Sequence, residues 1–190
     1  MDRMSSRRVR VVLLCEDNQH ETFVRRFLSA MGWNTRELYV VKSPSASGAA
    51  EQFVRERFPD ELAAYHQRKN SAASALIAII DADSKTVYER KGELEDASRQ
   101  NGVPFRSADD AVALLVPKRN IETWIKYLME GEAEEDKAYP KLQRQRECRE
   151  AVEKLVELCR QKNQPEGKVM SLADACNEYS TRIAPLRKEL

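Results

Sequence analysis

Two aspartates close the most apolar stretch of the chain, and their spacing suits the binding of a divalent metal ion. Asp81 and Asp83 directly follow the run ALIAII at residues 75–80. If the strand continues through both, their side chains point to the same face, roughly 6–7 Å apart along the strand. Two carboxylates that close repel each other, and a hard cation between them removes the repulsion. The pair therefore predicts a site for Mg²⁺ or Mn²⁺.

A turn is the alternative interpretation of the same two residues. Aspartate is common where strands end, and Asp83 or Ser84 could cap the helix that follows. The apolar strand before the pair favours the metal site, because it places the pair at the end of a sheet.

More acids follow the first apolar run of the chain, VRVVLLC. Glu16 and Asp17 close that run, and Glu21 lies in the first turn of the helix predicted next. If the run lies beside the strand that ends in Asp81, one or more of these acids faces the aspartate pair. Capping is the alternative for Glu21, because Asn18 and Glu21 have the spacing of a capping box. Two groups of acids that meet could hold one or two metal ions and clamp both sides of a phosphodiester.

The elements that must position these acids alternate between strand and helix along the chain. The expected strands lie at residues 9–15, 38–41, 75–80 and 112–116. The expected helices lie at residues 18–31, 49–69 (broken or kinked near Pro59), 86–100, 120–129, 141–162 and 171–190. This alternation predicts an α/β, Rossmann-like fold, with a mostly parallel sheet of about four strands and helices on both faces. The working groups of such sheets gather at the carboxyl ends of the strands, where these acids lie.

The length of 190 residues suits one domain with a sizeable core. We expect an α/β domain over residues 1–132 and a C-terminal helical extension over residues 133–190, packed on the same domain. An acidic stretch, EGEAEED, lies at the division.

Composition excludes several classes of protein. The 32 Lys and Arg nearly balance the 31 Asp and Glu, so a nucleic-acid partner must be held by a local patch rather than a global basic field. No apolar run approaches the ~18–20 residues of a membrane span, so no membrane association is expected. The four cysteines and two histidines have no zinc-ligand spacing. These features are typical of a cytoplasmic protein.

The order of the acidic motifs resembles the Toprim fold, which is shared by topoisomerases, bacterial primases, recombination-mediator proteins and the overcoming-lysogenization-defect (OLD) type nucleases. In that fold an acid closes the first strand, another comes early in the next helix, and a later apolar strand ends in DxD. The stretch CEDNQHETFV is similar to the opening of small stand-alone Toprim-like proteins, and RNIETW at residues 119–124 resembles another segment of that group. The resemblance covers roughly the first 130 residues.

The first acid departs from the Toprim pattern. A glycine usually follows the first glutamate, whereas Asp17 follows Glu16 here. In the Toprim pattern the second acid lies four residues after the first. Glu21 has this separation only from Asp17. Glu16 or Asp17 could therefore be the first-strand ligand, and we favour Glu16.

Resemblance to Toprim nucleases implies metal-dependent cleavage of phosphodiester bonds in DNA or RNA by an activated water. Glu16, Asp81 and Asp83 would then hold Mg²⁺ or Mn²⁺. Glu21 and Glu122 would serve a second ion or the water. For Glu122 the helix dipole is an alternative explanation, since it favours an acid in the first turn of a helix.

Basic residues near these acids could bind the substrate. Lys85 could stabilise charge that develops on a phosphate oxygen, although a lysine at the start of a helix is commonly just exposed. Lys118 and Arg119 follow the fourth expected strand and are better placed to hold a nucleic-acid backbone. His20 could move protons, but a histidine in the first turn of a surface helix is expected to be exposed, and we leave it out of the site.

A response-regulator receiver is an alternative function. The stretch VVLLCEDNQHETFVRRFLSAMGW is similar to the opening strand, acidic pair and first helix of a receiver. A receiver places its phosphoacceptor aspartate about 40 residues after that pair, whereas Asp81 lies over 60 residues on. Lys118 could supply the lysine that a receiver needs. Rapid labelling of Asp81 by small phosphodonors would support this alternative.

A non-catalytic Toprim-like interaction subunit is a further alternative. OLD-type proteins join a Toprim nuclease to an ABC-type ATPase in one chain, but this chain has no GxxxxGK[ST] motif. The resemblance therefore implies a separate ABC-type ATPase as partner and anti-phage defence as the setting.

Overall fold

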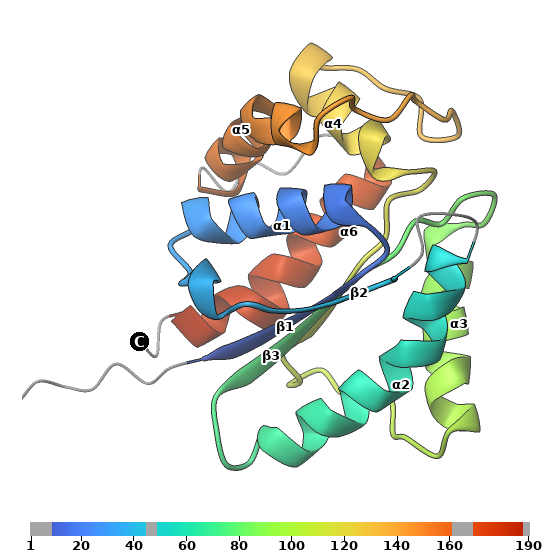
Figure 1. The fold of residues 1–190 in the computed structure, drawn as a ribbon, viewed down its shortest axis with the longest axis vertical. Coiled ribbons are helices and arrows are strands. Elements are labelled where there is room, and N and C mark those ends of the chain that lie inside the picture. Colours follow the sequence, from blue (N-terminus) through green and yellow to red (C-terminus); the bar gives the residue numbers. More distant parts are fainter. Residues whose placement is uncertain (1–8, 45–48, 161–168, 188–190) are drawn as a thin grey trace, which may run out of the picture.

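The computed structural model describes residues 9–44, 49–160 and 169–187. Its centre is a sheet of four parallel strands in the order β2-β1-β3-β4 (Figure 1). This architecture confirms the predicted α/β, Rossmann-like fold with a parallel sheet. The strands are β1 (Arg10–Cys15), β2 (Tyr39–Lys42), β3 (Ser74–Ile79) and β4 (Val112–Leu115).

The two central strands are the most apolar, as burial on both faces requires. All six residues of β3 are buried, and five of the six in β1 are. Parallel strands that helices cover on both faces have nearly continuous apolar sequences. The sequences of β1 and β3 follow this rule. Cys15 pairs with Ile79 in the register of β1 and β3. Glu16 therefore leaves the sheet next to the residues that follow β3.

Helices cover both faces of the sheet (Figure 1). The helices α2 and α3 lie on one face, and α1 and α6 lie on the other, with α4 and α5 beyond α1. Their bounds are α1 (Asn18–Ala30), α2 (Ala50–Arg68), α3 (Val87–Gln100), α4 (Ile121–Glu130), α5 (Arg149–Arg160) and α6 (Met170–Glu178).

Helix α2 continues through Pro59, so of the predicted break or kink at that residue the break does not occur. A proline inside a helix removes one backbone hydrogen bond, which destabilises the helix locally. Here Phe58 and Leu62 are fully buried on either side of the proline. Their packing holds the helix together across the lost bond.

The first C-terminal helix begins later than predicted. Residues 141–144 are not helical, and α5 is preceded only by a 3₁₀ turn at Gln145–Cys148. The predicted end of α5 and the last three residues lie outside the described residues. Helix α6 continues into a π-helical turn at Tyr179–Ile183 and a 3₁₀ turn at Ala184–Arg187.

The segment after residue 132 shares a core with the α/β part. Ser171 in α6 accepts a hydrogen bond from the buried indole of Trp124 (2.8 Å), and Tyr179 accepts one from Trp33 (3.0 Å). Helix α6 thus covers the part of the sheet that α1 leaves open (Figure 1). No helix in the described ranges is long and apolar enough to cross a membrane.

Candidate metal centre

Two of the predicted acids, Glu16 and Asp81, meet where the direction of strand order changes in the sheet. From β1 the chain goes to β2 on one side and then to β3 on the other. The carboxyl edge between β1 and β3 is therefore a topological switch point, the usual place for a ligand in open α/β sheets. Glu16 follows β1 and Asp81 follows β3 at this edge.

Three side chains converge at this edge and form a candidate metal site, which we call the metal centre: Glu16, His20 and Asp81. One ligand atom from each lies within 4.8 Å of the others. The Nε2 atom of His20 is 3.1 Å from Oδ1 of Asp81, and the backbone N–H of Asp81 donates to Oε1 of Glu16 at 2.6 Å. In the described part of the chain, this is the one group of three or more such side chains with metal-binding spacing.

His20 joins the centre because of how α1 begins. The N-cap of α1 is Asp17, whose Oδ1 accepts hydrogen bonds from the backbone N–H groups of Gln19 (2.9 Å) and His20 (3.0 Å). The predicted capping box of Asn18 and Glu21 is therefore wrong. The Asp17 carboxylate is used to cap the helix. Of the two acids that follow β1, Glu16 is therefore the one that belongs to the centre.

The prediction that His20 is exposed is also wrong, since this residue is 0% exposed. The sequence carried a signal that could have found it. His20 precedes Phe23, Val24 and Phe27 by three, four and seven residues, and all three are buried. That spacing places the imidazole on the apolar face of the helix, pointing inward.

Electrostatics within the metal centre are strongly coupled. Burial alone would lower the pKa of His20, but the carboxylates of Asp81, Glu16 and Asp17 raise it to about 9. Burial raises the pKa of Glu16 to about 7, with His20 lowering it and Asp81 raising it. Buried acids that repel each other in this way are held together by a positive charge between them. In the protein alone, the imidazolium of His20 supplies part of that charge.

Glu122 lies next to the metal centre in the first turn of α4, and it is buried. Burial raises the pKa of its carboxyl group, and the charge of Asp81 raises it further, while His20 lowers it. These influences place Glu122 beside the centre as an additional acid. It is not one of the three converging side chains.

Asp83 is not part of the group, so the structure does not form the predicted same-face pair with Asp81. Strand-like hydrogen bonding ends with Ala82, whose N–H donates to the carbonyl of Pro117. Asp83 then adopts a left-handed conformation (φ 55°) in a turn, and its side chain is 54% exposed. The carboxylate lies 3.4 Å from Nη2 of the buried Arg90 on α3. Asp83 therefore lies in a turn, as the alternative interpretation states. The residue that caps α3 is Thr86, however, and not Asp83 or Ser84.

Two other predicted site residues have partners elsewhere. Glu21 accepts from Lys42 at 2.7 Å and from Arg25 at 3.0 Å. Burial would raise the pKa of Glu21, but these two cations lower it below its usual range. Lys85 forms an ion pair with Glu93 on α3. Neither residue contacts the metal centre in the described structure, because each is held by an ion pair outside it.

Basic side chains lie around this edge of the sheet. Lys141 is 3.5 Å from Asp17, and Lys118 is 2.8 Å from the exposed Asp136. Arg119, just before α4, influences the charge of Asp83 and has no hydrogen bond or ion pair with another described residue. The edge therefore combines partly buried acids with cations, of which Arg119 is the one without an ion pair among the described residues.

Comparisons with protein-family models, curated proteins and solved structures found no match for this chain. Its function must therefore be inferred from the geometry of the described residues.

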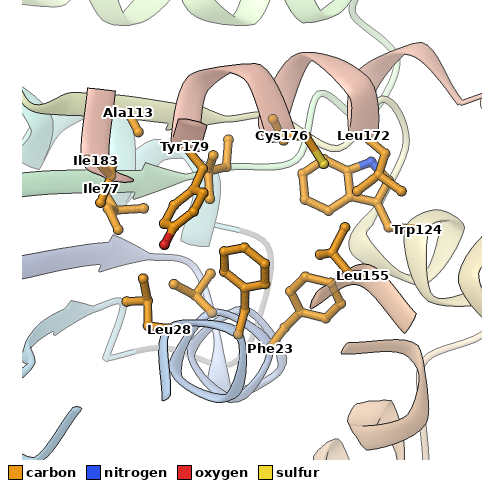
Figure 2. Close-up of a pocket in the computed structure, with 14 residues that line it drawn as sticks. Phe23, Leu28, Ile77, Ala113, Trp124, Leu155, Leu172, Cys176, Tyr179 and Ile183 are labelled. Carbon is orange, nitrogen blue, oxygen red and sulfur yellow. The ribbon is translucent and has the colours of Figure 1, made fainter. Parts of the chain in front are cut away.

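An apolar cavity under α1 and α6 is not a second site (Figure 2). Phe23, Trp124, Leu172 and Tyr179 are among its lining side chains, and its volume is about 30 Å³. A space of this size corresponds to about one water molecule, and an apolar lining offers that water no partners. The cavity is a packing gap in the core.

Proposed function

We propose that this protein is a divalent-metal-dependent nuclease that hydrolyses phosphodiester bonds in DNA or RNA. The observation that carries the proposal is the convergence of Glu16 and Asp81, with His20, at the switch point of a parallel sheet. These residues come from two strand ends and a helix start, so the fold itself brings them together. The similarity of the acidic motifs to Toprim nucleases supports the same chemistry.

The residues fit a metal ion by their chemistry. Glu16 and Asp81 are partly buried acids whose like charges repel each other. Burial and this repulsion both raise the pKa of Glu16. Carboxylates in such a setting are ligands for hard divalent cations such as Mg²⁺ and Mn²⁺. When bound, such an ion lowers the pKa of a water molecule and offsets charge on a phosphate.

The remaining residues at the edge would handle the proton and the substrate. Glu122 is buried beside the centre, and its raised pKa suits it to take a proton from a water molecule. Arg119 is placed to hold a phosphate of the substrate, since a guanidinium binds phosphate oxygens in a bidentate way. Asp83, Glu21 and Lys85 lie outside the proposed machinery because their side chains pair with other residues.

The near-zero net charge predicts weak binding to naked polymer. We therefore propose that the chain works in the cytoplasm with a partner, and the Toprim resemblance indicates a separate ABC-type ATPase in anti-phage defence. That setting rests on the resemblance alone.

Removal of the Glu16 carboxylate is expected to abolish cleavage. Plasmid DNA, single-stranded DNA and tRNA would be incubated with Mg²⁺ or Mn²⁺, with and without a genetically linked ATPase. We expect cleavage by the native chain, its loss with EDTA, and a fall of at least about 100-fold in Glu16→Gln.

Glu56→Gln is the matched control for this assay. Glu56 is exposed on α2 and bonds only Gln52 of the same helix among described residues, so this variant should keep native activity. Cleavage that survives unchanged in Glu16→Gln would contradict the proposal. Complete inactivity with the ATPase present would favour the interaction-subunit alternative.

The receiver alternative retains one structural argument. The strand order β2-β1-β3-β4 matches four of the five strands in the 2-1-3-4-5 order of receiver domains, in which an aspartate follows the third strand. Lys118, however, pairs with Asp136 and not with Asp81 in the structure. Stoichiometric labelling of Asp81 by acetyl phosphate would support a receiver over a nuclease.

A further inference from the structure

One of the three side chains in the metal centre offers nitrogen instead of oxygen. The imidazole of His20 is fully buried and lies 3.1 Å from the Asp81 carboxylate. Its other ring nitrogen, Nδ1, is also buried and has no hydrogen-bond partner among the described residues. A histidine with a purely structural role normally uses both ring nitrogens when it is buried. The polar contacts of this imidazole among the described residues are therefore confined to Nε2, the nitrogen that faces the acids.

The distances in the centre suit shared binding of one ion. Two atoms that bind the same ion at about 2.1 Å and at right angles lie about 3 Å apart. Nε2 of His20 and Oδ1 of Asp81 already have this separation. An oxygen of Glu16 lies within 4.8 Å of both, so the three atoms are close enough to surround one ion.

A set of one imidazole and two carboxylates discriminates between metals. Mg²⁺ prefers oxygen ligands and holds its water tightly, so an imidazole contributes little to its binding. First-row transition ions bind imidazole nitrogen well, with affinities that rise from Mn²⁺ along the series. Asp83, the oxygen donor that would have suited Mg²⁺, is turned toward Arg90.

We propose that His20 is a metal ligand and that the centre selects a first-row transition-metal ion, such as Mn²⁺, over Mg²⁺. This inference rests on the metal centre of the proposed function and specifies its cofactor. It also assigns His20 a role that the acidic motif does not contain.

Pulsed electron paramagnetic resonance of Mn²⁺ bound to the full chain tests the inference directly. Modulation by a coordinated ¹⁴N nucleus is expected in the native protein and should disappear in His20→Gln, whose amide offers oxygen. Calorimetry should show at least a tenfold weaker Mn²⁺ affinity in His20→Gln and a change of less than about threefold for Mg²⁺.

His66→Gln is the control, because the chain has only two histidines. His66 lies near Asp110, outside the metal centre, so this variant should keep the nitrogen signal and both affinities. If His20→Gln does not fold, the spectrum of the native protein and that of His66→Gln still decide the matter.

Two results would overturn the inference in distinguishable ways. Mn²⁺ that binds through Asp81, with no nitrogen modulation, would exclude His20 as a ligand and leave the proposed nuclease intact. Absence of any Mn²⁺ binding by the native chain would overturn the inference and the proposed function together. Equal losses of Mn²⁺ and Mg²⁺ affinity in His20→Gln would contradict the selectivity.

Discussion

Glu178→Gln is expected to lower the free energy of unfolding by about 3–5 kcal/mol at pH 7, because it leaves the buried Arg106 without its anion, whereas Lys91 keeps its ion pair with Asp174. Glu178 ends helix α6 and is almost fully buried. Arg106 donates to both of its carboxylate oxygens, and Lys91 donates at 2.9 Å. Glutamine keeps the shape of the side chain but removes the charge that these cations require.

The same carboxylate completes the edge of the sheet. β4 is an edge strand, and the N–H of Leu114 donates to Oε2 of Glu178 at 3.1 Å. A buried N–H without a partner costs about 1–3 kcal/mol. Glu178 therefore joins α6 to the sheet as well as neutralising Arg106 and sharing Lys91 with Asp174.

The contribution of Glu178 to the free energy of unfolding should decrease as the pH falls. Burial would raise its pKa, but Arg106 and Lys91 outweigh burial and lower the pKa from 4.5 to about 2. A carboxyl group with a lowered pKa in the folded state stabilises the protein above the unfolded pKa, and this stabilisation is lost as the pH falls through the folded pKa. The shift corresponds to about 3 kcal/mol, lost between about pH 5 and pH 2.

Urea unfolding of the native chain and of Glu178→Gln, repeated from pH 7 down to pH 3, measures this effect. The difference between the two proteins isolates Glu178, because other carboxyl groups titrate in both. That difference should be largest at pH 7 and shrink as the pH approaches 3. A difference that stays below 1 kcal/mol at pH 7, or that does not change with pH, would contradict the assigned role.

Glu130→Gln provides the comparison for an exposed ion pair. Glu130 ends α4 and pairs with Lys126 one turn earlier, with its side chain 56% exposed. Exposed pairs of this kind contribute only about 0–1 kcal/mol, because water screens both charges. Its replacement should therefore leave the unfolding curve almost unchanged.

Sequence reasoning found the sheet and two of the three residues in the metal centre. Apolar runs bounded by acids identify buried parallel strands and their carboxyl ends, so Glu16 and Asp81 could be placed at one edge. His20 could also have been found, because it continues the spacing of Phe23 and Phe27 on the buried face of α1. The interpretation of His20 as exposed considered its position in the helix and neglected that spacing.

Other features depend on contacts between distant parts of the chain. Asp83 turns away from Asp81 because Arg90 is buried on α3, where it also bonds Glu51 (2.8 Å) and Glu93 (2.7 Å). Glu178 meets Arg106 across 72 residues. Local spacing carries no information on such ion pairs, since each charged partner is equally compatible with an exposed position. The packing of α3 and α6 decides them.

Asp81→Asn is expected to weaken Mn²⁺ binding by at least about 100-fold and to abolish cleavage, whereas Asp83→Asn should change either by less than about threefold. Both variants replace a carboxylate by its amide, only two residues apart in the chain. Asp81 lies at hydrogen-bonding distance from His20 and within the converging group, so its loss removes a charged ligand. Asp83 is exposed and pairs with Arg90, so its loss leaves the centre complete.

The substitution of Asp83 is also mild for the backbone. Asp83 has a φ of 55°, and asparagine adopts this left-handed conformation as readily as aspartate does. The turn that leads into α3 should therefore persist, and a loss of function could not be attributed to a disrupted turn. Thermal unfolding of both variants checks that they remain folded.

Calorimetric titration with Mn²⁺, followed by the cleavage assay, separates the two arrangements of the aspartates. Equal losses of Mn²⁺ affinity and cleavage in the two variants would mean that the same-face pair predicted from the sequence forms when metal binds. A loss confined to Asp83→Asn would contradict the centre of Glu16, His20 and Asp81. A loss confined to Asp81→Asn is the expected result, because the chain turns after Ala82 and only the first aspartate of the motif faces Glu16.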